Sequence, residues 1–383
     1  MIPLALYLHF PWCVSKCPYC DFNSHALKDA LPEERYIEAL LADVAVQAPR
    51  VRGRPVTSLF LGGGTPSLFP PAALAQLFDG LRRHLTIDAS AEITLEANPA
   101  TVERGRFAEY HAIGINRVSL GAQSFSIETL KVLGRIHHPA DVLRSAEELH
   151  AAGLSNFNLD LMYALPDQTP AAALEDVRAA LALAPAHVSH YQLTLEPGTL
   201  FAARPPPLPD DDTAWQMQQE CQALLDASGY AQYEVSAYAR PGHRCRHNLN
   251  YWRFGDYLGV GAGAHGKLTD ATVARSTHLR EPRRYLAAAA GGPEWREVPV
   301  ADLPFEFMMN ALRLNEGFAA DDYTAKTGLP LAGIQPTLES LTAEGLLLSQ
   351  GARWRTTPRG QQFLNEVLQH FLPGEISPDG TGP

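Results

Sequence analysis

Tyr7-Leu8-His9-Phe10-Pro11-Trp12 leads directly into Cys13-Val14-Ser15-Lys16-Cys17-Pro18-Tyr19-Cys20, so that an apolar run is followed by three cysteines with the spacing C-x3-C-x2-C. We interpret Ala5–Phe10 as a first strand and the cysteines as part of the loop after it. Thiolates are soft ligands that select iron–sulfur clusters or zinc. Three of them leave one iron of a [4Fe–4S] cluster open to another molecule, whereas a structural zinc ion would need a fourth ligand, for which His9 or His25 is available.

The rest of the chain repeats an alternation of short apolar runs and longer amphipathic segments. Such an alternation predicts βαβ units around a parallel sheet, and six units over about 200 residues predict an α/β fold with a partial (β/α)6 TIM-like barrel. Functional side chains should then follow the carboxyl ends of the strands. The expected strands are Ala5–Phe10, Ser58–Leu61, Glu92–Glu96, Arg117–Leu120, Asn158–Leu161 and His187–Thr194, and the expected helices are Pro32–Gln47, Pro71–His84, Val102–Ala112, Ser126–Leu133, Pro139–Ala151 and Pro170–Leu183.

The length of 383 residues predicts two or three domains. We expect the barrel over residues 1–235, a connecting region over 236–300, a small C-terminal winged-helix-like α+β domain over 301–373 and a disordered tail over 374–383. In the C-terminal part, Phe305–Leu314, Asp321–Thr327 and Gln335–Glu344 read as helices and Leu346–Leu348 and Trp354–Thr356 as a two-strand wing. We interpret this module as a cap or partner surface rather than a DNA reader.

Composition narrows the class of protein. Hydrophobic residues make up 46% of the chain and charged residues 19%, which is typical of a globular protein. The net charge of −11 argues against electrostatic binding of nucleic acid over a large basic surface. No stretch reaches the roughly 18 apolar residues of a membrane helix, the first residues lack a signal peptide's basic region, and five cysteines are a poor disulfide framework. We therefore expect a cytoplasmic protein.

Several motifs, taken in order, resemble the radical S-adenosylmethionine (SAM) superfamily, in the branch that contains oxygen-independent coproporphyrinogen III oxidase. Besides the cysteine loop they are Leu61-Gly62-Gly63-Gly64-Thr65-Pro66-Ser67, Glu96-Ala97-Asn98-Pro99, Gly121-Ala122-Gln123-Ser124-Phe125 and Asn158-Leu159-Asp160-Leu161-Met162-Tyr163-Ala164-Leu165-Pro166. The resemblance implies a [4Fe–4S] cluster on Cys13, Cys17 and Cys20, with SAM on the open iron.

The same resemblance implies a set of SAM contacts. Gly63, Gly64 and Thr65 match the loop that meets the methionine part, and Glu96 matches a carboxylate that binds the ribose. The other matching positions are Tyr7, Tyr19, Gln123, Arg135 and Asp160. Without the resemblance, a turn, a helix cap, a packed aromatic ring or structural hydrogen bonding would explain each of these residues equally well.

Two departures argue against the oxidase itself. Asp21-Phe22 follows Cys20 where the oxidase has a further cysteine, and only twelve residues precede Cys13, whereas the oxidase has a long N-terminal extension. In addition, His247-Asn248-Leu249-Asn250-Tyr251-Trp252 fits H-N-x-x-Y-W, a signature of the HemW branch of heme chaperones. A neutral imidazole can bind heme iron, so we predict His247 as a heme ligand, although a lone histidine beside aromatic rings is commonly structural.

The function predicted is that of a heme chaperone, without coproporphyrinogen turnover, which binds heme and passes it to acceptor proteins; whether it also acts as an enzyme is left open. Membrane respiratory enzymes are candidate acceptors, which would bring the protein to the membrane periphery during transfer. Radical chemistry, if retained, requires a low-potential donor such as flavodoxin or ferredoxin. The alternatives are a coproporphyrinogen III dehydrogenase or a radical SAM methylase. The sequence leaves the number of chains open, with a dimer as one option.

Overall fold

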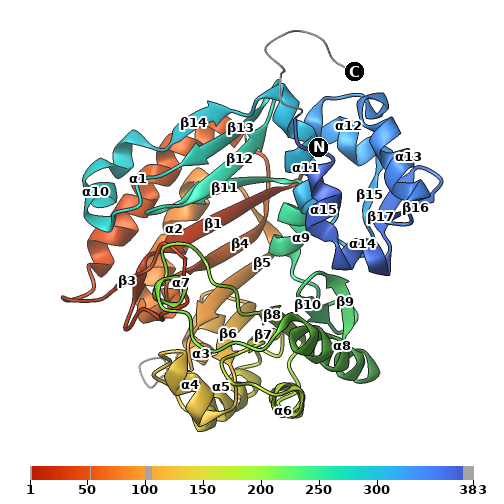
Figure 1. Cartoon of the computed structure of the whole chain (residues 1–383). Helices are drawn as coiled ribbons and strands as arrows, with labels where there is room; N and C mark the ends of the chain where they lie inside the picture. Colours follow the sequence, from red (N-terminus) through yellow and green to blue (C-terminus); the bar gives the residue numbers. More distant parts are fainter. Residues whose placement is uncertain (1, 52, 100–105, 374–383) are drawn as a thin grey trace.

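The computed structural model describes residues 2–51, 53–99 and 106–373. Within these ranges the central element is a twelve-stranded sheet (Figure 1). All six strands expected from the apolar runs are present, and they are parallel neighbours in chain order. Their near-continuous burial is typical of parallel strands. They are β1 (Leu4–Phe10), β4 (Val56–Gly63), β5 (Ile87–Ala97), β6 (Arg117–Gln123), β7 (Phe157–Tyr163) and β8 (His187–Gln192).

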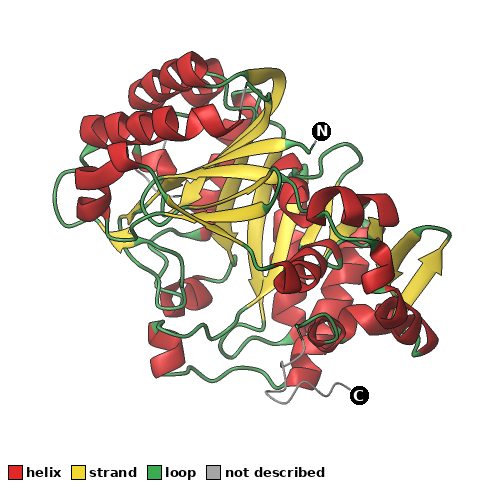
Figure 2. Ribbon diagram, turned by 90° about the horizontal axis from the view of Figure 1, so that it is seen from above, coloured by secondary structure: helices red, strands yellow, loops and turns green. Residues whose placement is uncertain are grey.

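The helices between these strands also follow the predicted pattern. Their apolar faces join one large core with the sheet, which Figure 2 shows flanked by helices. Proline or a capping hydroxyl marks several starts: Ser126 accepts a hydrogen bond from the Thr129 amide, and Thr169 from that of Ala172. The helices between the strands are α1 (Glu33–Val51), α2 (Pro71–His84), α3 (Phe107–Ala112), α4 (Ile127–Val132), α5 (Pro139–Ala151) and α6 (Pro170–Ala182), and β8 is followed by α7 (Leu200–Ala203) and α8 (Asp211–Ala227). Residues 102–105 of the expected third helix lie outside the described residues.

The region 236–300, expected to be a connection, instead extends the sheet. β11 (Asp256–Val260) pairs in parallel with β1, from Leu4 opposite Asp256 to Leu8 opposite Val260. Antiparallel strands then continue to the edge: β12 (His265–Thr269), β13 (Val273–Thr277) and β14 (Glu294–Glu297). Helices α9 (Arg246–Trp252) and α10 (Pro282–Ala288) belong to the same region. The short apolar run Tyr257–Val260 was the signal in the sequence that could have predicted a strand in this region.

The opposite edge is formed by β10 (Ala237–Ala239) and β9 (Ala231–Glu234), both antiparallel. The full order is β14-β13-β12-β11-β1-β4-β5-β6-β7-β8-β10-β9. Because β14 and β9 lie at opposite ends of this order and do not pair, the barrel is partial and open. The radical SAM-type α/β fold expected from the sequence is therefore present, with seven parallel strands rather than six.

The C-terminal part packs around a second, smaller core, which also includes Phe254 and Val273 from the preceding region. The three expected helices and both wing strands are present, together with the short strand β15 that was not expected. These elements are α11 (Leu303–Ala311), β15 (Phe318–Ala319), α12 (Ala320–Thr327), α13 (Gln335–Ala343), β16 (Leu347–Gln350), β17 (Arg353–Thr356), α14 (Pro358–Gln362) and α15 (Leu364–Gln369). The expected tail 374–383 lies outside the described residues, and the domain boundaries stay a prediction.

Candidate functional site

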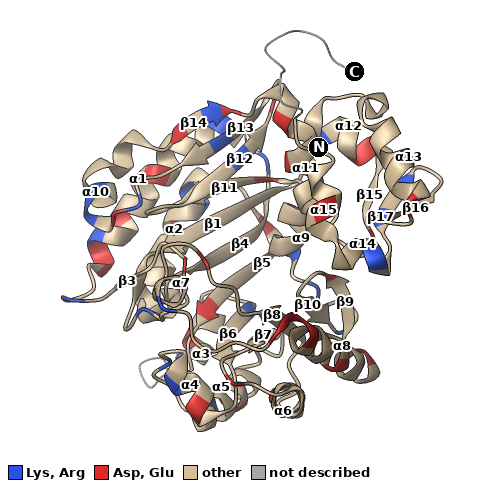
Figure 3. Cartoon of the chain, viewed as in Figure 1, with Lys and Arg blue, Asp and Glu red and all other residues tan. Residues whose placement is uncertain are grey.

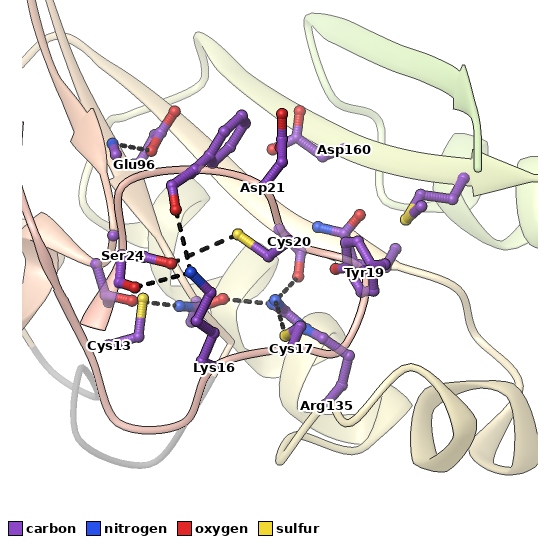
Figure 4. Close-up of a pocket in the computed structure, with 18 of the residues that line it drawn as sticks. Cys13, Lys16, Cys17, Tyr19, Cys20, Asp21, Ser24, Glu96, Arg135 and Asp160 are labelled. Atoms are coloured by element: carbon purple, nitrogen blue, oxygen red, sulfur yellow. Dashed lines mark hydrogen bonds between the residues drawn. The ribbon is translucent and has the colours of Figure 1, made fainter. Parts of the chain in front are cut away.

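The three cysteines face one cavity because their loop is closed at its base. β2 (Trp12–Cys13) pairs with β3 (His25–Ala26), and the Leu27 amide donates to the Cys13 carbonyl at 2.8 Å. All three thiols are free and half-buried. In Figure 4 Cys13, Cys17 and Cys20 lie along this loop, with Lys16 reaching across it, and Lys16 Nζ donates to the carbonyls of Phe22 and Ser24.

A cavity of about 330 Å³ collects most of the predicted site residues at the carboxyl ends of the parallel strands. This placement is the one expected for a barrel of parallel strands, because its strand ends all open onto one face. From the prediction, the lining contains Cys13, Cys17, Tyr19, Cys20, Gly63, Gly64, Thr65, Glu96, Gln123, Arg135 and Asp160. Tyr7 and His247 lie elsewhere.

The glycine loop after β4 is fastened to the start of the cysteine loop. The Gly64 amide donates to the Phe10 carbonyl at 2.7 Å, and the Thr65 amide donates to the Trp12 carbonyl at 2.8 Å. Gly63 has φ +107, and a Cβ there would lie 2.3 Å from the His9 ring. A side chain at position 63 is therefore excluded both by backbone conformation and by space.

Two carboxyl groups, Glu96 at the end of β5 and Asp160 in β7, face the same cavity. Burial, reinforced by the charge of Asp160, raises the pKa of Glu96 to about 8, against the opposing hydrogen bond from the Gly63 amide at 3.0 Å. Burial also raises the pKa of Asp160, although Asn158 and Ser119 donate hydrogen bonds to its carboxylate. At neutral pH the pair therefore resists carrying two negative charges and can both donate and accept hydrogen bonds.

Arg135 connects the cysteine loop with β6. Its Nη1 donates to Cys17 Sγ at 3.7 Å and its Nη2 to the Gly121 carbonyl at 2.8 Å, and Asn98 Oδ1 also accepts from Nη2. A guanidinium beside a thiolate stabilises the charged form of the sulfur. Asn98, which also donates to Thr65 Oγ1 at 2.8 Å, was not among the predicted site residues although it stands in a quoted motif.

Gln123 is held in an unusual backbone conformation at the end of β6, with φ +67. Its Oε1 accepts a hydrogen bond from the Tyr191 hydroxyl at 2.7 Å, and both residues line the cavity. Left-handed backbone at a non-glycine residue costs on the order of 1 kcal/mol and is enriched at functional sites. Tyr191 was also missed, and its position in the expected strand His187–Thr194 was the signal available.

Comparison with known proteins agrees with this geometry. Residues 7–180 match the radical SAM superfamily and residues 298–363 match the HemN C-terminal domain. The heme chaperone HemW of Escherichia coli is 51% identical over 97% of this chain and 98% of its own length. The chain belongs to the HemW family. The heme chaperone HemW of Haemophilus influenzae is 46% identical, covering 97% of this chain and 99% of that protein.

The structure of E. coli coproporphyrinogen III oxidase (HemN), described as a radical SAM enzyme, has the same fold as this HemW-family chain. The two superpose with a TM-score of 0.82 at 24% identity, over 97% of this chain and 90% of the oxidase. The fold expected from the sequence motifs is therefore confirmed. In the described part of the chain, no helix is long and apolar enough to cross a membrane.

A second cavity of about 500 Å³ lies beside the first and contains Tyr7, the predicted SAM contact that the first cavity lacks. The two cavities share Asp21, Phe22, Gly63 and Glu96. The remaining lining comes from β1, from the loop before β3, from α9 and from the region after α9. These residues are Tyr7, His9, Asn23, Tyr251, Tyr257, Gly263, His265 and Arg280. Tyr251 belongs to the H-N-x-x-Y-W motif, so the HemW-family signature reaches this cavity.

His247 of the same motif reaches neither cavity. Its ring is 1% exposed and stacks on Phe60, with the ring centroids 5.0 Å apart. Ser58 Oγ lies 3.2 Å from Nδ1, and the Tyr251 hydroxyl lies 3.0 Å from Nε2. Both ring nitrogens are thus engaged, and binding of iron by His247 would require these hydrogen bonds to break and the ring to leave its pocket.

One of the two candidate fourth ligands for zinc, His9, is already hydrogen-bonded at both ring nitrogens. His9 Nε2 bonds the Asn23 carbonyl at 2.9 Å and its Nδ1 lies 3.0 Å from the Tyr7 hydroxyl. Among the residues that the structure describes, no three His, Cys, Asp or Glu side chains converge as they would on one metal ion. A cluster makes a different demand, because each thiolate binds a separate iron at a corner of the cube.

Proposed function

We propose that this chain is a heme chaperone that holds a [4Fe–4S] cluster with SAM in the first cavity, binds heme next to it and passes the heme to acceptor proteins. The observation that carries the proposal is the junction of the two cavities at Gly63 and Glu96. One cavity offers three thiols and the other offers aromatic rings from the HemW-family motif. Membership of a family whose relatives are named heme chaperones supports the same assignment.

Cys13, Cys17 and Cys20 would hold the cluster. Their thiols line one cavity, and Arg135 donates a hydrogen bond to the Cys17 sulfur. Burial raises the pKa of Cys13, so its thiol favours the protonated form until a cation replaces the proton. When bound, the cluster would supply low-potential electrons and an open iron for SAM.

The other residues of the first cavity would hold SAM. Backbone at Gly63 and Gly64 allows the close approach that the methionine part needs, and Glu96 provides hydrogen-bonding capacity for the ribose hydroxyls. Tyr19, Thr65, Gln123, Arg135 and Asp160 supply further polar groups around the same space. Tyr7 would act from the far side, since its hydroxyl bonds His9 and its ring lines the second cavity.

The role of His247 as a heme ligand stays a prediction. Because its ring is buried and hydrogen-bonded at both nitrogens, the contacts give more support to a role in positioning Tyr251. Delivery to membrane respiratory enzymes and reduction by flavodoxin or ferredoxin are parts of the proposal that rest on the family resemblance. The cytoplasmic location rests on the cysteine content of the chain, and a dimer stays one option for the number of chains. Lys and Arg positions are spread over several elements in the view of Figure 3, among them α10, β14 and α14. The absence of a nucleic-acid partner stays a prediction from the net charge of −11.

Anaerobic reconstitution tests the function directly. The reconstituted protein should bind about one heme per chain, should release heme to an apo-acceptor, and should form no protoporphyrinogen IX from coproporphyrinogen III with SAM and reductant. A dehydrogenase prepared in parallel provides the positive control for that last assay. Product formation, or absence of heme binding by the folded protein, would refute the proposal, and methylated product with S-adenosylhomocysteine would point to a methylase instead.

A further inference from the structure

Within the proposed heme-binding function, on which this inference rests, we propose that the second cavity is the porphyrin site, with His265 as the iron ligand and Arg280 as the partner of a propionate. His265 begins β12, and Arg280 lies in the loop after β13, so both belong to the region 236–300. The cavity of about 500 Å³ is within the range of small-molecule and cofactor sites.

The hydrogen-bonding state of the nearby histidines selects His265. His9 and His265 both line the cavity, but His9 is 5% exposed and both of its ring nitrogens are bonded. His247 is buried and bonded at both nitrogens as well. The ring of His265 is exposed, and no side chain or backbone group of the described residues forms a hydrogen bond with it. Its imidazole is the one that can offer a lone pair to iron without breaking an existing contact.

Arg280 supplies a cation at the rim of the same cavity. No carboxylate in the described part of the chain forms an ion pair with its exposed side chain. Its backbone is fixed, because Asn23 Nδ2 donates to the Arg280 carbonyl at 2.8 Å and to the Ala262 carbonyl at 2.9 Å. A guanidinium free of partners is suited to the bidentate recognition of a carboxylate such as a heme propionate.

Aromatic rings provide the surface for the macrocycle. Tyr251 and Tyr257 pack edge to face with centroids 4.4 Å apart, and both line the cavity with Tyr7. The bond between His247 Nε2 and the Tyr251 hydroxyl holds this pair in place. His247 thereby becomes a positioning residue of the porphyrin site, which gives the H-N-x-x-Y-W motif a role without iron ligation.

Titration of the full-length, reconstituted protein with hemin tests the inference by absorbance and electron paramagnetic resonance. His265→Ala should lower hemin affinity at least about tenfold and remove the histidine-ligated spectrum, and added imidazole should restore that spectrum. His265→Cys should give the spectrum of a thiolate-ligated heme. His247→Ala should retain the histidine-ligated spectrum, and His84→Ala, which changes an exposed histidine of α2, should match the wild type.

Arg280→Ala provides an independent arm. It should weaken binding of hemin several-fold but leave binding of hemin dimethyl ester, whose propionates carry no charge, at the wild-type level. Unchanged iron content and circular dichroism show that each variant is folded. Wild-type binding together with an unaltered spectrum in His265→Ala, or loss of the spectrum in His247→Ala alone, overturns the inference while the proposed function stands. Failure of the folded wild type to bind hemin overturns both.

Discussion

Arg135 Nη1 donates a hydrogen bond to Cys17 Sγ across 3.7 Å, although 118 residues separate the two in the chain. The same guanidinium is anchored by the Gly121 carbonyl at 2.8 Å, so its direction toward the sulfur is set by β6. Burial of this contact strengthens the interaction of the cation with any negative charge on the cysteine ligand.

Arg135→Met should therefore make a reconstituted cluster harder to reduce, because removal of a cation beside a ligand sulfur disfavours the added electron. We expect the midpoint potential to fall by about 60 mV, which corresponds to one charge-assisted hydrogen bond of roughly 1.4 kcal/mol. Redox titration followed by electron paramagnetic resonance measures the change. Arg204→Met, at the end of α7, is the control and should keep the wild-type potential. An unchanged potential in the Arg135 variant would show that the Arg135 guanidinium does not stabilise the reduced cluster.

The three proposed cluster ligands are half-buried, whereas Cys221 and Cys245 are buried. Replacement of Cys13, Cys17 or Cys20 by alanine should reduce the reconstituted iron content from about four to less than about one per chain, because three thiolates are the minimum for a stable site. Cys221→Ala, at a buried position in α8, should keep the full iron content. Iron and sulfide assays with absorbance spectra decide the matter, and retained iron in a loop variant would argue against that ligand.

Glu96→Gln should change the pH dependence of stability. Because the pKa of Glu96 is raised to about 8 in the folded protein, its favourable protonated form contributes fully below pH 4.5, and the contribution is lost as pH rises toward 8. The variant should gain stability relative to wild type over that interval. We expect the free energy of unfolding of the variant to exceed that of the wild type by about 1–2 kcal/mol at pH 8. The half-buried position of Glu96 reduces the full effect of its pKa shift.

Thermal unfolding of the cluster-free protein between pH 5 and pH 8.5 measures this difference. Glu196→Gln, at the rim of the same cavity, is the matched control and should show no such trend. A Glu96→Gln variant whose melting temperature runs parallel to that of the wild type across the interval would contradict the raised pKa. The same variant should also bind SAM more weakly, because the proposed SAM site uses the Glu96 carboxyl group for the ribose hydroxyls.

Gly63→Ala should destabilise the protein by about 2 kcal/mol or more. The residue combines φ +107 with a Cβ position only 2.3 Å from the His9 ring, so strain adds to a clash. Gly198→Ala separates the two effects, because Gly198 has φ +86 but nothing within 4 Å of its Cβ position. Denaturant unfolding should show a loss near 1 kcal/mol for Gly198→Ala and a clearly larger one for Gly63→Ala. Equal losses of stability in the two variants would mean that the close approach of the His9 ring does not contribute to the effect of Gly63→Ala.

The six parallel strands, the helices between them and most of the first cavity could be predicted from the sequence. The spacing of apolar residues along the chain is a local property. Parallel strands place their carboxyl ends at one edge of the sheet, whatever the order of the strands. Residues at the carboxyl ends of those strands, such as Glu96 in β5 and Gln123 in β6, therefore line the same cavity, as the sequence pattern alone predicts.

Other features were decided only by the tertiary structure. The pairing of β11 with β1 made the region expected to be a connection part of the sheet, and His265 now lines the same cavity as Tyr7. The packing of α9 against β4 buried His247 between Ser58 and Phe60, where its motif had suggested an open ligand. Side-chain direction and burial depend on which distant segments pack together, and no local period of the sequence encodes that choice. Local pattern thus determined which residues follow the strands, and long-range packing determined which of two cavities each of them faces.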